Sequence, residues 1–139
     1  MQKTIRDVMT TGVRTVGADA SVLEAARVMR ESDIGDVVVI DNGRLCGILT
    51  DRDVVVRGIA EGRDPAQTRV SDIASRELIT VAPDHSLGQA VRLMRERAIR
   101  RLPVEDNGKI VGMLSIGDLA VDVDPHSALA DISAAPPNV

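Results

Sequence analysis

Two short segments of the sequence each place a hydroxyl and a carboxylate three residues apart, directly after a glycine and two apolar residues. They are Gly47-Ile48-Leu49-Thr50-Asp51-Arg52-Asp53 and Gly112-Met113-Leu114-Ser115-Ile116-Gly117-Asp118. At the start of a helix, such a pair lies on one side of the first turn. It can then hydrogen-bond two neighbouring hydroxyls, such as those of a ribose, while the free N–H groups of the helix end suit an anion.

The same pattern also has a purely structural interpretation. Ser or Thr with an acidic residue three positions later is close to a capping box, with Asp in place of the preferred Glu or Gln. Its presence in both segments does not discriminate, because a duplicated fold duplicates its caps, and the two interpretations are compatible. The preceding glycine likewise allows either another backbone or a ligand to approach the strand closely.

Both segments belong to a larger duplication. Residues 5–57 align without a gap onto residues 70–122 at a constant offset of 65, with nineteen identical pairs. Two copies are too few for a solenoid, and each copy is near the lower size limit for a core of its own. We therefore expect two pseudo-symmetric repeats packed as one module, over 5–60 and 70–123, with a linker over 61–69 and a C-terminal tail over 124–139.

Each repeat predicts the same series of elements, which gives a mixed α/β (α+β) fold of β-α-β-β-α repeats. Short turns are expected at 5–9 and 70–74, and brief strands at 13–16 and 78–81. Ser21 and Ser86 open amphipathic helices, each with Glu or Gln three residues later. Asn-Gly pairs at 42–43 and 107–108 predict hairpins, and Thr50 and Ser115 then open the last helix of each repeat.

Composition excludes several classes of function. The net charge of −4 and the pI of about 5.1 argue against sequence-independent nucleic-acid binding. The chain has no aromatic residue, so a bound ring must lie between aliphatic side chains or on an arginine. No apolar run is long enough to span a membrane, the N-terminus lacks a signal-peptide pattern, and the one cysteine suits a reducing compartment. We expect a cytoplasmic protein.

The sequence offers no catalytic or metal-binding constellation. His85 and His126 are far apart, no Cys/His spacing is typical of a metal site, and no nucleophile triad, P-loop or dinucleotide loop is present. Cys46 aligns with Val111 on a strand, which favours a small, buried apolar role. We predict a protein that is not an enzyme.

Taken together, the motifs over residues 5–123 resemble a tandem pair of CBS domains, the arrangement called a Bateman module. The matching segments are IRDVM and VSDIA, DASVLEA and DHSLGQA, IRRLPVEDNG, and the junctions GILTDRD and GMLSIGD. The resemblance implies a sensor that binds AMP, ADP, ATP, S-adenosylmethionine or a similar adenosine-containing ligand in the cleft between the repeats. It implies that the protein requires no cofactor and forms a homodimer, with a possible protein partner.

The resemblance also implies roles for individual residues. Thr50 with Asp53 and Ser115 with Asp118 would bind ribose hydroxyls. The adenine pocket would be formed by backbone and aliphatic side chains of Thr15, Val16, Val37, Val39, Ile48, Thr80, Val81, Leu102, Val104 and Met113.

Phosphate contacts distinguish the repeats. The second repeat has Arg100-Arg101 before its Leu-Pro-Val strand, where the family often places basic residues, whereas the first has Gly35-Asp36. Arginine matches phosphate oxygens, whereas a carboxylate repels them. Alternatively, the two arginines form a solvated surface pair.

Two hypotheses follow. The first is a non-catalytic regulatory module that binds an adenosine-containing ligand. The alternative is a ligand-free interaction or scaffold protein with vestigial pockets, which Asp36 and the lack of a fused effector domain favour. The apolar helix faces can serve either the core or a dimer contact.

Overall fold

The computed structural model describes residues 3–76, 78–123, 132 and 135. The predicted tail lies outside the described residues except for Ile132 and Ala135. The elements run in the order α1 (Ile5–Val8), β1 (Thr15–Gly17), α2 (Val22–Ser32), β2 (Asp36–Asp41), β3 (Arg44–Thr50), α3 (Asp51–Asp53), η1 (Val54–Ile59), α4 (Val70–Ile73), α5 (Leu87–Arg97), β4 (Arg101–Asp106), β5 (Lys109–Ser115) and α6 (Ile116–Val123). The predicted mixed fold of two repeats is confirmed.

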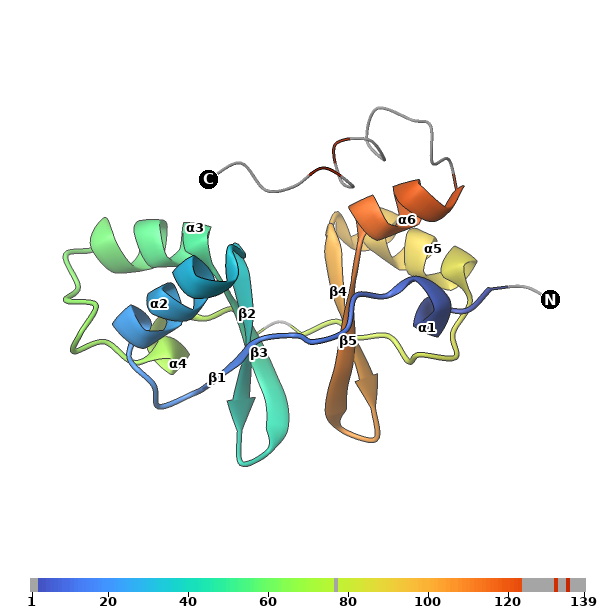
Figure 1. Ribbon diagram of the computed structural model, residues 1–139. Coiled ribbons are helices and arrows are strands. Elements are labelled where there is room, and N and C mark those ends of the chain that lie inside the picture. The colour runs from blue at the N-terminus through green and yellow to red at the C-terminus, as the bar shows by residue number, and fades with distance from the viewer. Residues whose placement is uncertain (1–2, 77, 124–131, 133–134, 136–139) are drawn as a thin grey trace. The chain divides into compact units, whose positions relative to one another are not determined.

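The chain forms two compact units, which Figure 1 shows as two hairpins, each with its own helices. The unit formed by Arg14–Leu78 is called the first unit here. It holds a three-stranded sheet in which β1 pairs in parallel with β2, and β2 pairs with β3 as an antiparallel hairpin. Its core contains Val16, Ala18, Val22, Ala25, Met29, Val37, Val39, Leu49, Val70 and Ile73.

The second unit combines residues of the N-terminal segment up to Val13 with residues from Ile79 onward. Its sheet is the β4–β5 hairpin, and in place of the strand predicted at 78–81 the described residues form the bridge Val81–Val104. Its core contains Ile5, Val81, Ala90, Met94, Leu102, Val104, Leu114 and Leu119.

The compact units therefore differ from the sequence repeats at their entry segments. Helix α1 precedes the first repeat, yet Ile5 lies in the core of the second unit, and the backbone of Thr10 pairs with Met113. Helix α4 opens the second repeat, yet its Val70 lies in the core of the first unit, and Ser75 pairs with Ile48. Each hairpin is completed by the entry segment of the other repeat.

Local signals in the sequence fix the helix starts and the turns. The Ser21 hydroxyl accepts a hydrogen bond from the N–H of Glu24, and Ser86 with Gln89 forms a complete capping box. Asn42 and Asn107 have φ values of 52° and 53°, as tight Asn-Gly hairpins require. The predicted hairpins and caps are confirmed. The sequence could predict them because these contacts join residues only a few positions apart.

The last helices of the two repeats differ. In the second unit α6 is α-helical, whereas in the first unit α3 is one short turn that continues as the π-helix η1. The N–H of Ala60 bonds to the carbonyl of Val55, five residues earlier. Among the described residues, no helix combines the length and the apolar character that a membrane crossing needs.

Candidate functional site

The junction between β5 and α6 combines a helix cap with a pair of polar side chains. The N–H of Ser115 donates to Asp118 Oδ2 at 3.0 Å, and the N–H of Asp118 donates to Ser115 Oγ at 3.1 Å. The capping interpretation is therefore confirmed in this junction. A carboxylate offers about four lone-pair positions, so Asp118 retains capacity to accept further hydrogen bonds.

A residue from far along the chain also contacts this junction. The hydroxyl of Thr10 donates to Asp118, with distances of 3.2 Å to Oδ1 and 3.4 Å to Oδ2. Thr10 lies in the N-terminal entry segment, whose backbone pairs with β5 at Met113. The Asp118 carboxylate is thus held from two sides, by its own helix start and by a strand neighbour 108 residues away in sequence.

The same segment makes a second link to α6. Lys3 Nζ donates to the carboxylate of Asp122. That hydrogen bond and the charge of Asp122 raise the pKa of Lys3. The ammonium therefore stays charged over the physiological range, and the pair joins the start of the chain to the last helix of this unit.

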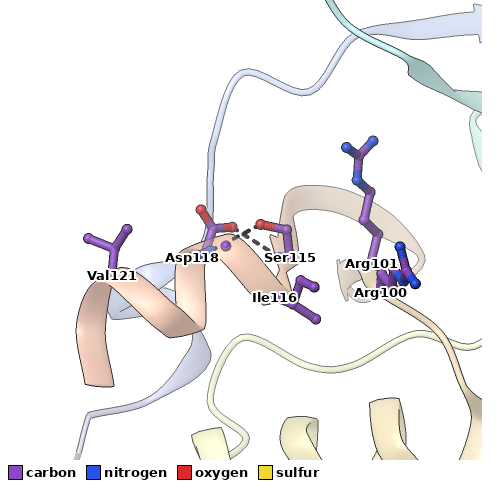
Figure 2. Close-up of a pocket in the computed structure, with 7 residues that line it drawn as sticks. Arg100, Arg101, Ser115, Ile116, Asp118 and Val121 are labelled. Atoms are coloured by element: carbon purple, nitrogen blue, oxygen red, sulfur yellow. Dashed lines mark hydrogen bonds between the residues drawn. The ribbon is translucent and has the colours of Figure 1, made fainter. Parts of the chain in front are cut away.

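A cavity of about 400 Å³ opens at this junction. Figure 2 shows Ser115 and Asp118 at the start of α6, with Arg100 and Arg101 on the neighbouring segment that enters β4. Residues that the sequence did not single out complete its lining: Ile116, Gly117 and Val121. The structure thus brings the predicted ribose pair and the predicted phosphate pair of the second repeat to one cavity.

The wall of this cavity is fixed by the backbone. The N–H of Ile116 donates to the carbonyl of Arg100 at 3.0 Å, so the segment before β4 is joined to the first turn of α6. Ile116 is 37% exposed and Val121 is 39% exposed, which leaves apolar surface beside the arginines. The cavity therefore combines two cations, one carboxylate, one hydroxyl and aliphatic surface.

The junction between β3 and α3 has the same backbone. The N–H of Thr50 donates to Asp53 Oδ2 at 3.0 Å, and the N–H of Asp53 donates to Thr50 Oγ1 at 3.1 Å. The N–H of Asp51 donates to the carbonyl of Gly35 at 2.9 Å, which matches the bond between Ile116 and Arg100. Thr50 and Asp53 therefore form a second, equivalent cap.

The charges around this first junction are different. A side chain added at Gly35 would meet Asp51 Oδ2 at 3.0 Å, so the Asp51 carboxylate fills the side on which Arg100 stands in the other unit. Asp53 faces the guanidinium of Arg57, with Nε 3.9 Å from Oδ1. Asp36 adds a further carboxylate at the start of β2.

The residues predicted for an adenine pocket lie in several places. Val37, Val39, Leu102 and Val104 are at most 1% exposed and belong to the cores of their units. Val16 and Val81 are also buried, whereas Thr15 is exposed, and Thr80, Ile48 and Met113 are half-buried. The cavity beside Ser115 contains none of these ten residues.

The glycines that begin each junction make room for a backbone. A Cβ at Gly47 would lie 2.7 Å from the carbonyl oxygen of Ser75. A Cβ at Gly112 would lie 2.6 Å from Met9 Sδ and 3.0 Å from the carbonyl oxygen of Thr10. Of the two roles that the sequence left open, close approach of a backbone is the one that the structure shows.

Other predicted features lie apart from this cavity. The Cys46 thiol is half-buried in β3, and burial raises its pKa. Among the described residues, no cluster of three or more His, Cys, Asp or Glu side chains could hold a metal ion. His85 accepts a hydrogen bond from the N–H of Ala82, and His126 lies outside the described residues.

Comparison with known proteins finds one protein family and relatives that match over nearly the whole chain. The family profile described as CBS domain matches residues 5–58 and 70–123. The CBS domain-containing protein YhcV of Bacillus subtilis is 43% identical over 133 residues, which cover 93% of this chain and 94% of YhcV. Hypoxic response protein 1 of Mycobacterium tuberculosis is 35% identical, with 94% and 92% of the two chains covered.

Solved structures show the same similarity. The structure of hypoxic response protein I, described with two coordinated zinc ions, has a TM-score of 0.77 and 36% identity over 85% of this chain and 97% of that chain. A hexameric CBS-CP12 protein from bloom-forming cyanobacteria has a TM-score of 0.78 and 28% identity, with 90% of this chain and 74% of that chain covered.

Proposed function

The chain belongs to the CBS domain family, and on that premise we propose that it is a regulatory module that binds an adenosine-containing nucleotide and catalyses no reaction. The observation that carries the proposal is the cavity of about 400 Å³ in which Arg100 and Arg101 lie with Ser115 and Asp118. Arginines suit phosphate oxygens, and a hydroxyl–carboxylate pair suits a ribose diol. One cavity therefore offers partners for both polar parts of a nucleotide.

Within this proposal, the phosphate-bearing ligands AMP, ADP and ATP are favoured over S-adenosylmethionine. The cavity presents two guanidinium groups and one carboxylate, so a sulfonium cation gains little there, whereas each added phosphate gains a charge-assisted contact. The adenine ring would lie on aliphatic surface, because the chain has no aromatic residue. The predicted adenine residues of both repeats stay a prediction.

The first junction supports a more restricted role. Thr50 and Asp53 repeat the cap, but Asp36 and Asp51 add negative charge where the second junction has cations. We propose that this junction does not bind phosphate, so that the chain holds one anionic nucleotide per copy.

The binding proposal is tested by isothermal titration calorimetry against AMP, ADP, ATP, S-adenosylmethionine and NAD, because heat needs no aromatic chromophore. Saturable heat with AMP, ADP or ATP, weakened in Asp118→Ala, supports the proposal. Unchanged affinity in a folded Asp118→Ala protein contradicts the assignment of Asp118 to the ribose.

A ligand-free interaction protein is the second candidate. Val55, Val56 and Ile59 on η1 are 55%, 43% and 59% exposed, and apolar side chains grouped on one helix favour contact with another protein. The absence of heat with all five ligands would favour this candidate.

We further propose a homodimer, which analytical ultracentrifugation would test, and the relative described as hexameric shows that this family includes oligomers. The cytoplasmic location stays a prediction.

A further inference from the structure

A second cavity lies in the first unit; Gly47 is part of its lining, whereas Thr50 and Asp53 are not. Its volume is about 350 Å³, within the range of small-molecule pockets. Ala18, Val39 and Ala74 give it an apolar lining, and Asp41 and Arg76 add one charge of each sign. The side chain of Cys46, the one cysteine of the chain, also lines it.

The duplication explains why there is space at this place. Ala74 aligns with Met9 at the offset of 65, and both follow a short helix that packs beside a junction glycine. A Cβ at Gly112 would meet Met9 Sδ at 2.6 Å, whereas a Cβ at Gly47 would lie 3.8 Å from Ala74 Cβ. The methionine of the second unit thus occupies the region that the alanine of the first unit leaves open.

Two opposite charges border this open region without neutralising each other. Asp41 and Arg76 act on the pKa of the Cys46 thiol in opposite directions, so both lie near the same side chain. Within the described part of the chain, neither forms an ion pair at 4.0 Å or less. Arg76 Nη2 donates to the carbonyl of Ser71 at 3.4 Å, which leaves most of its five donors for a ligand.

We propose that this cavity binds a zwitterionic small molecule of the amino-acid type with an aliphatic side chain. The ligand's ammonium group pairs with Asp41, and its carboxylate pairs with the planar guanidinium of Arg76. Its side chain lies on Ala18, Val39 and Ala74. The thiol of Cys46 forms part of the wall and stays protonated at neutral pH, so the binding is not covalent.

This cavity has no residue in common with the cavity beside Ser115, and Val39 is the one residue that it shares with the predicted adenine pockets. The second unit does not preserve its chemistry. Asp106 matches Asp41, but Thr11 stands at the position of Arg76, and Met9 at that of Ala74. The proposal therefore predicts one amino-acid site per chain.

The lone thiol gives a direct readout. The protein is treated with methyl methanethiosulfonate, and modification of Cys46 is followed by mass spectrometry with leucine, valine or methionine at millimolar concentration. We expect at least one of them to slow the modification at least fivefold. Leucinamide and N-acetylleucine each lack one charge and should need at least tenfold higher concentrations. Equal protection by these derivatives, or no protection by any of the three amino acids, overturns the proposal.

Substitutions then test the residues. Asp41→Asn and Arg76→Gln alter exposed side chains, so both variants should fold, and each should weaken protection at least tenfold. Asp106→Asn, at the aligned position of the second repeat, is the matched control and should bind as the parent does. Unchanged protection in both Asp41→Asn and Arg76→Gln contradicts the proposed charge pairing.

A filling substitution tests the cavity itself. Ala74→Met introduces the residue that the second unit carries at the aligned position, and calorimetry with the protecting amino acid should then give no binding heat. Circular dichroism establishes whether this variant is folded. Retained heat in a folded Ala74→Met protein overturns the cavity as the binding place.

Discussion

The two hydroxyl–carboxylate junctions have matching backbones and opposite electrostatic surroundings. In both, the hydroxyl and the carboxylate close a capping box with distances between 3.0 and 3.1 Å. Around Ser115 and Asp118 stand two arginines, whereas around Thr50 and Asp53 stand the carboxylates of Asp36 and Asp51. The two junctions thus share their local structure and differ in the charges that surround it.

The comparison shows that a cap and a binding pair are distinguished by neighbours outside the motif. Asp118 accepts a hydrogen bond from the hydroxyl of Thr10, which lies far away in sequence. Asp53 instead faces the guanidinium of Arg57, four residues later in η1. The motif alone therefore identifies two candidate sites, and its surroundings favour one of them. Substitutions that exchange these surroundings test this conclusion most directly.

The largest effect is expected from exchanging the arginines. The double variant Arg100→Gly/Arg101→Asp carries the residues of positions 35 and 36, and ATP affinity should fall about 100-fold or more as two charge-assisted contacts are lost. Adenosine, which has no phosphate, should lose less than about threefold on the same reasoning.

Calorimetry measures both affinities. Arg95→Gln is the control, because it removes an exposed arginine of α5 that does not line the cavity. An equal loss for ATP and adenosine would show that the arginines support the fold of the cavity rather than contact phosphate.

The next effect separates capping from binding at the carboxylates. Asp118→Ala should weaken nucleotide binding about 30-fold through lost charge-assisted hydrogen bonds, and Asp53→Ala should leave it unchanged. Both variants lose the same cap and should lose about 1 kcal/mol of unfolding free energy. Urea denaturation followed by circular dichroism measures the stability of each, and weakened binding in both variants would contradict the proposed asymmetry.

A third test compares the close approaches at the junction glycines. Gly47→Ala should lower the unfolding free energy by about 2 kcal/mol, because the added Cβ meets the fixed carbonyl of Ser75 at 2.7 Å. Gly112→Ala should cost less, because its nearest neighbour is the flexible end of Met9. Chemical denaturation of the two variants decides the order, and a greater loss in Gly112→Ala would show that the approach of Thr10 is the tighter one.

The smallest effect is expected at Thr10. Thr10→Val removes the hydroxyl that bonds to Asp118 and should weaken nucleotide binding about fivefold, which corresponds to a net hydrogen bond of roughly 1 kcal/mol. Ser75→Ala at the aligned position is the control and should bind as the parent does. A matching loss in Thr10→Val and Asp118→Ala would instead indicate that Thr10 contacts the ligand itself.

The sequence predicted most of the fold because its signals are local. Ser86 with Gln89 and the Asn-Gly turns act over two or three residues, so their types and spacing are sufficient. The weakest predictions concern long-range partners. The strand expected at 78–81 is reduced to the bridge Val81–Val104, because only that part of the entry segment pairs with β4.

The candidate site was predicted only in part, because some of its residues belong to local motifs and others do not. Ser115, Asp118, Arg100 and Arg101 were named from the sequence, and the structure brings them to one cavity. Ile116 and Val121 had no signal beyond helical spacing. The π-helix η1 was not predicted either, since nothing in the spacing of Val54–Ile59 distinguishes five-residue from four-residue hydrogen bonds.

By itself the sequence determined the duplication, the caps, the hairpins and the difference in charge between the two junctions, because each depends on residue identity and short spacing. Only the tertiary structure decided which entry segment joins which hairpin, and hence that Thr10 reaches Asp118 and that Ala74 leaves space beside Cys46. Because the two entry segments are similar and the two hairpins are similar, either segment could pair with either hairpin. Only packing over the whole chain selects between these pairings.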